Sequence, residues 1–431
     1  MIGTGLASAP SDGQTSTPSA AGAGAVAAWQ PSGNLVTLAG KAGVAVSTGD
    51  PQDQAAVPDR GDSLTHAGSK ERGTSLADGR KPAAPAVVRG RSGDFRRSPA
   101  RRPARAYAAL DLGTNNCRLL IAEPSYHEFR VIDAFSRVVR LGEGLGFGDR
   151  LGDDAIERTV AALRVCKAKL EARNVVRARL IATEACRLAS NGMEFISRVR
   201  EEVGLAIEVV NRETEATLAV MGCAALAHPK AGSVIIFDIG GGSTEVAWLD
   251  GQIAGGAICP SERIRAWDSL PVGVVTLAER YGGVQVTRAV FEEMVEEVSG
   301  RLLPFALKAG AAAASANFHL LGTSGTVTTV GGIHLGLERY DRRRVDGMWM
   351  RGRDIEDVTT TLLETDLRQR AQNPCIGRDR ADLVLAGCAI LEAIRRAFPA
   401  EYLRIADRGL REGILMTMMR EDKVWARRAP A

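Results

Sequence analysis

The sequence predicts a mixed α/β protein in which one strand–turn–strand design occurs twice, behind a long N-terminal segment of low complexity. From Tyr107 onward, segments with the period of strands alternate with segments of helical period. The stretch at 108–123, AALDLGTNNCRLLIAE, matches the one at 235–250, IIFDIGGGSTEVAWLD, in the order apolar strand, Asp, glycine turn and second strand. A design that repeats in this way indicates two domains of one kind.

Residues 1–105 differ in composition from the rest of the chain. Gly, Ala, Ser, Pro and Thr dominate this stretch, and no helix or strand period persists in it. Such a composition buries too little apolar surface to offset the entropy of ordering, which predicts a disordered tail. Its end, Arg89–Arg105, is basic and fits either a solvated linker or a contact with a polyanion or acidic surface. With Phe95 as its single aromatic residue, no specific nucleic-acid site is expected.

The first predicted domain, 106–232, holds a strand–turn–strand unit, further strands and three helical regions. Asp153 opens a segment of helical period and is placed to serve as its N-cap. We predict strands at 107–123, broken by the turn, and at 129–142, 178–184 and 206–211. We predict helices at 153–173, 184–203 and 213–226.

The second predicted domain, 233–420, restarts with a glycine turn and contains more helix than the first. We predict strands at 234–250, broken by the turn, and at 252–259 and 318–323. Helical periods run near 273–309 and again from the GTSGT stretch to about Arg420. The last residues, 421–431, are predicted to form a short tail.

Length and composition fit an ordinary globular protein inside the cell. The chain has 431 residues, of which 45% are hydrophobic, enough for two cores. Its seven cysteines form no CxxC pair and leave one over in any disulfide scheme, which favours a reducing compartment. No apolar run reaches the roughly 18 residues of a membrane span, and the first residues lack the features of a secretory signal. We therefore expect a cytoplasmic protein without a membrane segment.

Each glycine turn follows an Asp at the end of an apolar strand, and this arrangement suits phosphate. Glycines remove side chains, so main-chain N–H groups can converge on a phosphate oxygen. Two such loops on facing domains would hold opposite sides of a phosphoryl chain. Because carboxylates beside phosphate need a hard cation between them, Asp238 and Glu245, with Asp111 from the first copy, are candidate Mg²⁺ ligands. A plain β-turn is a sufficient explanation for one such loop. It explains less readily why two loops occur with matching residues on both sides.

Six stretches, taken in order, resemble the exopolyphosphatase and guanosine pentaphosphate phosphatase family, usually written Ppx/GppA. They are DLGTNNCRLLIAE, ATEACRLASNG, NRETEATLAVMG, FDIGGGSTEVAWL, LLGTSGTVTTVGG and DRGLREGIL. The resemblance implies the actin and sugar kinase superfamily fold, with two ribonuclease-H-like domains and an active-site cleft between them. It also implies the short, two-domain form of the family, because the five histidines form no His-Asp pair. Since family members are often dimers, the resemblance leaves open whether this protein forms a homodimer.

The resemblance also assigns candidate site residues. The family's catalytic glutamate falls on Glu215; Glu213 competes with it, but the two project about 200° apart on one helix, so only one should face the cleft. A phosphate-binding arginine falls on Arg187, with an ion pair to an acid of its own helix as the alternative, and Arg118 is a second candidate. The phosphate loops fall on Gly113, Thr114, Asn115 and Asn116 and on Gly240, Gly241, Gly242, Ser243 and Thr244.

Together these residues imply Mg²⁺-assisted hydrolysis of a phosphoanhydride, in which Glu215 deprotonates the attacking water and arginines bind the phosphoryl oxygens. We expect inorganic polyphosphate as the substrate, with guanosine pentaphosphate as a second or alternative substrate. A kinase of the same fold and a non-catalytic sensor of polyphosphate or an alarmone are the rival functions. Glu215 argues against the sensor, since binding an anion needs no carboxylate beside it.

Four arginines, Arg339 and Arg342–Arg344, gather in the stretch GLERYDRRRVDG. Such a run of charge is either a solvated loop or an anchor for the distal phosphates of a long polyanion.

Overall fold

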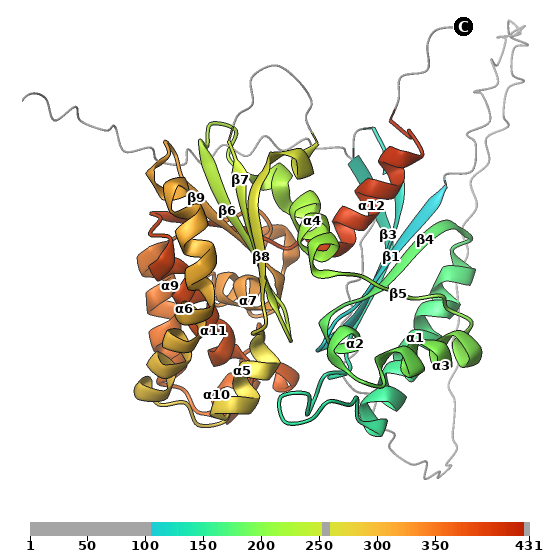
Figure 1. The fold of residues 1–431 in the computed structure, drawn as a ribbon, viewed down its shortest axis with the longest axis horizontal. Coiled ribbons are helices and arrows are strands. Elements are labelled where there is room, and N and C mark those ends of the chain that lie inside the picture. Colours follow the sequence, from blue (N-terminus) through green and yellow to red (C-terminus); the bar gives the residue numbers. More distant parts are fainter. Residues whose placement is uncertain (1–104, 127, 252–258, 426–431) are drawn as a thin grey trace, which may run out of the picture. The chain divides into compact units, whose positions relative to one another are not determined.

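The computed structural model describes residues 105–126, 128–251 and 259–425. The predicted disordered tail at 1–105 and the predicted strand at 252–259 therefore lie almost wholly outside the described residues, as does 426–431. The described residues form two mixed β-sheets with helices packed on them, which confirms the predicted α/β class (Figure 1). None of the helices in these ranges is long and apolar enough to cross a membrane.

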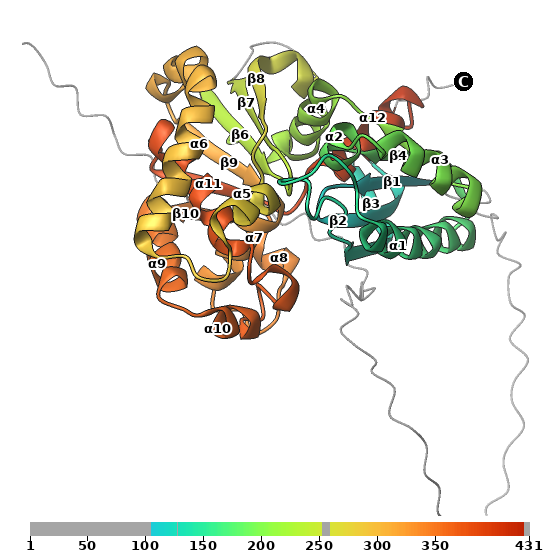
Figure 2. The same cartoon turned by 60° about the horizontal axis from the view of Figure 1, so that its bottom comes forward.

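The first sheet has five strands in the order β3-β2-β1-β4-β5. Its first three strands form an antiparallel meander, and the other two run parallel to β1. The strands are β1 (Ala106–Leu112), β2 (Asn116–Ser125), β3 (Glu128–Val138), β4 (Val175–Ala182) and β5 (Glu208–Val209). One face packs into a core with the helices α1 (Asp153–Ala172), α2 (Glu184–Leu188) and α3 (Gly192–Val203) (Figure 2).

The second sheet has six strands in the order β10-β11-β9-β6-β7-β8. β6, β7 and β8 are antiparallel, β9 and β11 run parallel to β6, and β10 is antiparallel to β11. The strands are β6 (Ser233–Ile239), β7 (Thr244–Asp250), β8 (Ile264–Leu270), β9 (His319–Thr323), β10 (Trp349–Arg351) and β11 (Tyr402–Ala406).

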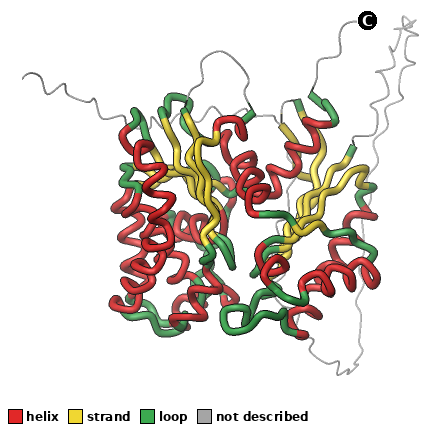
Figure 3. The backbone as a smooth tube through the Cα atoms, viewed as in Figure 1, coloured by secondary structure: helices red, strands yellow, loops and turns green. Residues whose placement is uncertain are grey.

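The helices of the second sheet pack mainly on one of its faces, where they form one large apolar core (Figure 3). They are α5 (Val274–Tyr281), α6 (Arg288–Ala309), α7 (Ser324–His334), α8 (Arg342–Val345), α9 (Gly352–Leu363), α10 (Leu367–Gln372) and α11 (Val384–Ala397). Short 3₁₀ turns lie at Ala224–Leu226, Pro260–Arg263, Gly310–Ala314 and Arg378–Arg380.

Two helices from distant parts of the chain, α4 (Arg212–Cys223) and α12 (Leu410–Glu421), pack against each other (Figure 1). Leu218 of α4 and Ile414 of α12 share a core with Tyr107 of the first sheet. Other residues of α4 share a core with β6 and β7 of the second sheet. The predicted division into 106–232 and 233–420 stays a prediction, and α12 shows that the second range contributes a helix to the first sheet.

Several elements differ from the prediction. Asp153 is the first residue of α1 and Gly152 takes the N-cap position, so the predicted Asp153 cap is wrong. The helices predicted near 273–309 are found as α5 and α6, whereas the strand predicted at 206–211 shortens to β5. The strands β8, β10 and β11 are absent from the predicted elements, and their sequences IRAWDSL, WMR and YLRIA mix charged and apolar residues.

The two strand–turn–strand repeats occupy equivalent places in their sheets. β1 and β2 pair with Asp111 opposite Arg118, and β6 and β7 pair with Asp238 opposite Glu245. Each pair lies beside a parallel strand, β4 in the first sheet and β9 in the second. Asp111 and Asp238 therefore hold the same position near the ends of corresponding strands, directly before a glycine turn.

Candidate active site

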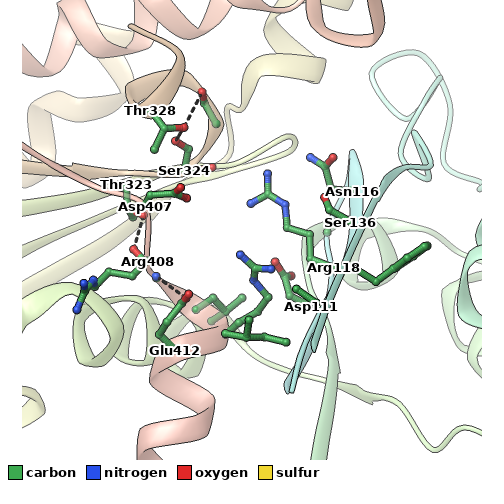
Figure 4. A pocket seen from close by; sticks show the side chains of 18 of the residues that line it. Asp111, Asn116, Arg118, Ser136, Thr323, Ser324, Thr328, Asp407, Arg408 and Glu412 are labelled. Atoms are coloured by element: carbon green, nitrogen blue, oxygen red, sulfur yellow. Dashed lines mark hydrogen bonds between the residues drawn. The ribbon is translucent and has the colours of Figure 1, made fainter. Parts of the chain in front are cut away.

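A large cavity opens where the strand ends that carry the two glycine turns meet. Its volume is about 1980 Å³, and its walls include both turns, the start of α7 and the residues just before α12. Figure 4 shows Asp111 and Arg118 extending from the first sheet, with Ser324 on the second-sheet side. All predicted site residues except Arg187 and Thr244 line this cavity.

The first glycine turn, 113–116, is a tight loop in which Gly113 N donates to Asn116 O at 2.9 Å. Thr114 and Asn115 are buried within it. The Oδ1 atom of Asn115 is buried and has no hydrogen-bond partner among the described residues. Because a buried acceptor without a donor is costly, a water or a protonated ligand in the cavity would be stabilised there.

The second glycine turn, 240–244, lies directly against the first. A Cβ added to Gly242 would lie 2.6 Å from Thr114 Oγ1, and one added to Gly241 would lie 3.1 Å from Asn115 N. A side chain at either position would force Thr114 or Asn115 to shift, so the glycines let the two loops approach this closely. The wall of the cavity is therefore formed here by backbone, as phosphate binding by main-chain N–H groups requires.

The two hydroxyl residues that follow these glycines have different surroundings. Ser243 lines the cavity, and its Oγ donates to Glu245 Oε1 at 2.8 Å. Thr244 is fully buried, and its Oγ1 donates to Val272 O at 2.7 Å. Thr244 thus fixes the turn to the core, and it does not line the cavity.

Three carboxylates predicted to bind metal, those of Asp111, Asp238 and Glu245, line the cavity. Burial and the charge of Asp111 raise the pKa of Asp238 to about 6. Burial and the charge of Asp238 raise the pKa of Glu245 to about 7. The pKa of Asp111 is also raised, mainly by burial. Burial and mutual repulsion therefore oppose the ionisation of these carboxylates in the absence of a cation.

These carboxylates fit Mg²⁺ in kind and number. Within the described ranges, no three His, Cys, Asp or Glu side chains gather closely enough to hold a metal ion by themselves. Mg²⁺ typically takes one or two carboxylates and completes its shell with waters and substrate phosphates, so it needs no such cluster. A cation would offset the repulsion among these carboxylates, and the unpaired Oδ1 of Asn115 could accept from a metal-bound water.

The predicted base, Glu215, lies in the first turn of α4, behind an N-cap formed by the Asn211 side chain. Glu215 is 8% exposed and lines the cavity, whereas Glu213 is exposed to solvent. The structure thus distinguishes two glutamates that the sequence leaves as competitors. Burial and the charge of Glu245 raise the pKa of Glu215 well above its ordinary value, and Arg187 acts in the opposite direction.

Arg187 lies behind Glu215 and is not among the residues of the cavity wall. Its Nη2 donates to Glu215 Oε2 at 2.8 Å, and its Nε donates to Glu184 Oε2 at 3.0 Å. Its Nη1 donates to Val210 O at 2.6 Å, so all three guanidinium nitrogens have protein partners. Glu184 also accepts from Arg212 at 2.7 Å. The structure therefore shows the ion pair on its own helix and no contact of Arg187 with the cavity.

Among the arginines of the cavity wall that are absent from the predicted site residues are Arg380 and Arg411. Arg380 Nη1 and Arg118 Nη2 lie 3.7 and 4.0 Å from the place of a Cβ on Gly325, so both guanidinium groups approach one point at the start of α7. Arg411 belongs to the DRGLREGIL stretch, which could have pointed to it. Arg380 falls between the recognised motifs, and no signal in the sequence marks it.

The arginine run at 342–344 does not form one surface. Arg342 lines the cavity, but its Nη2 donates to Glu412 Oε1 at 2.9 Å, so its charge is neutralised. The other two arginines of the run are exposed and are not among the lining residues. The anchor for distal phosphates therefore stays a prediction, and the exposed arginine of this stretch that lines the cavity is Arg339.

Comparison with known sequences points to one family. The model of the Ppx/GppA phosphatase family matches residues 120–422. A bifunctional 3-dehydroquinate synthase/phosphatase of Fusobacterium nucleatum is 26% identical in an alignment 318 residues long, which covers 70% of this chain and 44% of that protein. The chain thus spans less than half the length of this curated relative.

Solved structures share the fold. The Aquifex aeolicus member of the Ppx/GppA protein family is 28% identical, with a TM-score of 0.60 over 74% of this chain and 99% of that chain. An exopolyphosphatase from Cytophaga hutchinsonii is 22% identical, with a TM-score of 0.66 over 74% of this chain and 98% of that chain. At the lower identity the likeness shows the fold alone.

Proposed function

Because the chain belongs to the Ppx/GppA phosphatase family, we propose that it is a phosphoanhydride hydrolase of the exopolyphosphatase type. Its proposed substrate is inorganic polyphosphate, from which it releases the terminal phosphate, and guanosine pentaphosphate is the second or alternative substrate. The observation that carries this proposal is the pair of glycine turns in close contact beside the buried Glu215. Backbone N–H groups bind phosphate, and a carboxylate next to them suits activation of water better than anion binding alone.

The proposed substrate contacts come from both sheets. The turns at 113–116 and 240–243 would bind the terminal phosphoryl group through the backbone, and Arg118 and Arg380, which approach one point of the cavity, would bind its oxygens. Arginine suits this role because its planar fork matches two phosphate oxygens at once.

Glu215 is the proposed general base. Burial raises its pKa, so the ionised carboxylate has a high affinity for a proton of the attacking water. Because Arg187 engages Oε2, we assign the water to Oε1. The water oxygen bonds to the terminal phosphorus, the bridging P–O bond breaks, and the proton passes to Glu215. The shortened polyphosphate and orthophosphate are the products.

Asp111, Asp238 and Glu245 are the residues that would hold Mg²⁺. When bound, the ion supplies positive charge that offsets the charge of the terminal phosphoryl group. Asp238 is the central member of the three, because it raises the pKa of Glu245 and its own pKa is raised by Asp111.

The test is phosphate release by the purified full chain with Mg²⁺ and either polyphosphate or guanosine pentaphosphate. We expect free phosphate from polyphosphate with no requirement for ATP. A kinase of the same fold would consume ATP only with an acceptor present, and a sensor would release no phosphate. Release from guanosine pentaphosphate alone would move the proposal to the alternative substrate, and no release from either would contradict it.

A further inference from the structure

The residues that follow β3, 139–146, contact Glu279 of α5 and Asp382 just before α11, both of which belong to the part of the chain around the second sheet. We call these residues the bridging segment. Arg140 of this segment donates from Nη1 to Asp382 Oδ2 at 3.0 Å and from Nη2 to Asp382 Oδ1 at 2.9 Å. Its Nη2 also donates to Asp379 O at 3.0 Å. A guanidinium that meets both oxygens of one carboxylate fixes distance and orientation together.

A second contact joins the bridging segment to α5. Gly144 N donates to Glu279 Oε1 at 2.8 Å, and Gly146 N donates to Glu279 Oε2 at 3.1 Å. Both oxygens of the carboxylate are thus bound to backbone of the bridging segment. Hydrogen bonds to an ionised acceptor are stronger than neutral ones, so this contact adds to that of Arg140.

The bridging segment is also bonded directly to the first glycine turn. Val139 N and Arg140 N donate to Asn115 O at 2.9 and 3.0 Å, and Gly142 N donates to Thr114 O at 2.9 Å. A Cβ added to Gly142 would lie 2.3 Å from Thr114 Cγ2, so the segment and the turn are in close contact. A shift of the bridging segment therefore shifts the first turn.

Helix α5 is bonded in the same way to the second glycine turn. Val274 N donates to Gly240 O at 3.0 Å, and Val275 N donates to Gly241 O at 2.8 Å. Glu279 lies on the same helix, which is eight residues long and moves as a unit. The contact between Glu279 and the bridging segment thus connects one turn to the other.

The Asp382 side of the first contact is held by the buried Arg370. Its Nε donates to Ala381 O at 3.1 Å, and its Nη2 donates to Val284 O at 2.8 Å. Arg370 is 2% exposed, so these bonds are shielded from water. They fix the residue before Asp382 to the chain that follows α5.

We propose that Arg140 and Glu279 are positioning residues, which hold the two glycine turns at the spacing that binds one phosphoryl group. Neither is among the residues that line the cavity, so each acts through the turn to which its own segment is bonded. The kinetic consequence rests on the proposed function, whereas the coupling between the turns is a property of the fold alone.

Without these contacts, the turns spend a smaller fraction of time at the spacing seen here. The apparent affinity for substrate falls by that fraction, while substrate at saturation restores the spacing. We therefore expect KM for polyphosphate to rise about tenfold, with kcat changed by less than about twofold. Partial unfolding would instead lower kcat at an unchanged KM, because fewer molecules would be active.

Three variants and one control separate these outcomes. Gly146→Ala places a Cβ 2.6 Å from Glu279 Oε2, which displaces the carboxylate without a change of charge. Gly148→Ala is the matched control, because its Cβ would lie 3.6 Å from a backbone oxygen, an ordinary contact. Arg140→Asp breaks the other contact, and Asp suits the φ of 46° at this residue. Combination with Asp382→Arg reverses the ion pair and should restore KM toward the wild-type value.

Amide hydrogen exchange of the full chain without substrate tests the coupling apart from turnover. In Gly146→Ala, exchange should quicken both in the bridging segment and at Val274 and Val275, and Gly148→Ala should change neither. Faster exchange confined to the bridging segment, or a lower kcat at unchanged KM, would overturn the inference. If the wild type releases no phosphate from either substrate, the proposed function fails, and the exchange data alone decide on the positioning role.

Discussion

At the scale of single residues, the basicity of Glu215 depends on its neighbours. Burial favours its protonated form, while Arg187 at 2.8 Å favours the charged form. Arg187 is held in turn by Glu184, which is almost fully buried. The network therefore sets both the orientation and the basicity of the proposed base.

Replacement of Glu215 by Gln should remove this base and lower kcat by about 10²- to 10⁴-fold, because a positioned base typically contributes that much. The amide keeps the size of the side chain, so substrate binding should persist. Glu213→Gln is the matched control on the same helix and should keep kcat within about twofold. Phosphate release at saturating polyphosphate measures both, and equal losses would contradict the assignment.

Replacement of Arg187 by Gln should move the pH dependence of the reaction. The change removes the positive charge that lowers the pKa of Glu215, so that pKa should rise further. Since a general base acts only when it is deprotonated, the acidic limb of the kcat/KM profile should move to higher pH. If Arg187 instead contacted phosphate directly, the variant would have a higher KM, and the acidic limb of the kcat/KM profile would stay at the wild-type pH.

For single residues, the sequence predicts positions along the chain better than it predicts side-chain partners. Both glycine turns and Glu215 line the cavity as expected, because the order of the motifs fixes them. Arg187 and Thr244 do not line the cavity. Arg187 donates to the carbonyl of Val210 and Thr244 to that of Val272, and no local sequence pattern identifies these partners. Arg380 could not be predicted, because only tertiary contact brings it near Arg118.

At the scale of elements, the contact between α4 and α12 depends on two glycines. A Cβ added to Gly222 would lie 1.8 Å from Gly409 O, and one added to Gly413 would lie 1.9 Å from Leu218 O. Because the helices approach this closely, Glu215 at the start of α4 and the residues before α12 reach the same cavity.

Gly222→Ala should therefore destabilise the protein by about 1–3 kcal/mol, the usual range for an overpacked core. The added atom meets backbone, which cannot move aside as a flexible side chain would. Gly300→Ala is the matched control within helix α6, because nothing lies within 4 Å of its added Cβ. That control should gain roughly 0.5–1 kcal/mol from helix propensity. Urea unfolding measures both, and a loss of stability in both would point away from the helix contact.

The elements that the sequence does not predict are short or lie at sheet edges. β10 has three residues and pairs with β11 alone, so it shows no alternation long enough to recognise. β8 follows the undescribed residues 252–258 and has only two buried positions, Ser269 and Leu270. Strands of this kind depend on pairing with their neighbours in the sheet, β7 for β8 and β11 for β10, more than on their own sequence pattern.

At the scale of the whole molecule, the ionised carboxylates of Asp238 and Glu245 lower the free energy of unfolding near neutral pH. Burial and like charges raise the folded-state pKa of Asp238 to about 6 and of Glu245 to about 7. The stability that these groups contribute is present below their unfolded-state pKa values of 3.8 and 4.5. It is lost as the pH rises through about 6 and 7, because the folded state then carries the mutual repulsion.

Without Mg²⁺ at about pH 8, Asp238→Asn should therefore be more stable than the wild type, by up to about 3 kcal/mol from a shift of some two pKa units. Mg²⁺ should raise the Tm of the wild type by binding the folded state, and raise that of Asp238→Asn much less. Thermal unfolding at constant ionic strength, with K⁺ in place of Mg²⁺ as the control, measures both effects. An equal gain from Mg²⁺ in the two proteins would remove Asp238 from the metal site.

The order in which the chain is synthesised determines how long one face of the first sheet stays uncovered. The apolar face of the first sheet that includes Tyr107 and Ala109 is covered by Ile414 and Met418 of α12, about 300 residues later. At roughly 5–20 residues per second, a ribosome needs on the order of tens of seconds to add that length. During this time that face lacks its covering helix, although the strands that form it have already left the ribosome. The first sheet to be synthesised is therefore among the last to be completed, and a nascent chain must be kept from aggregating until α12 arrives.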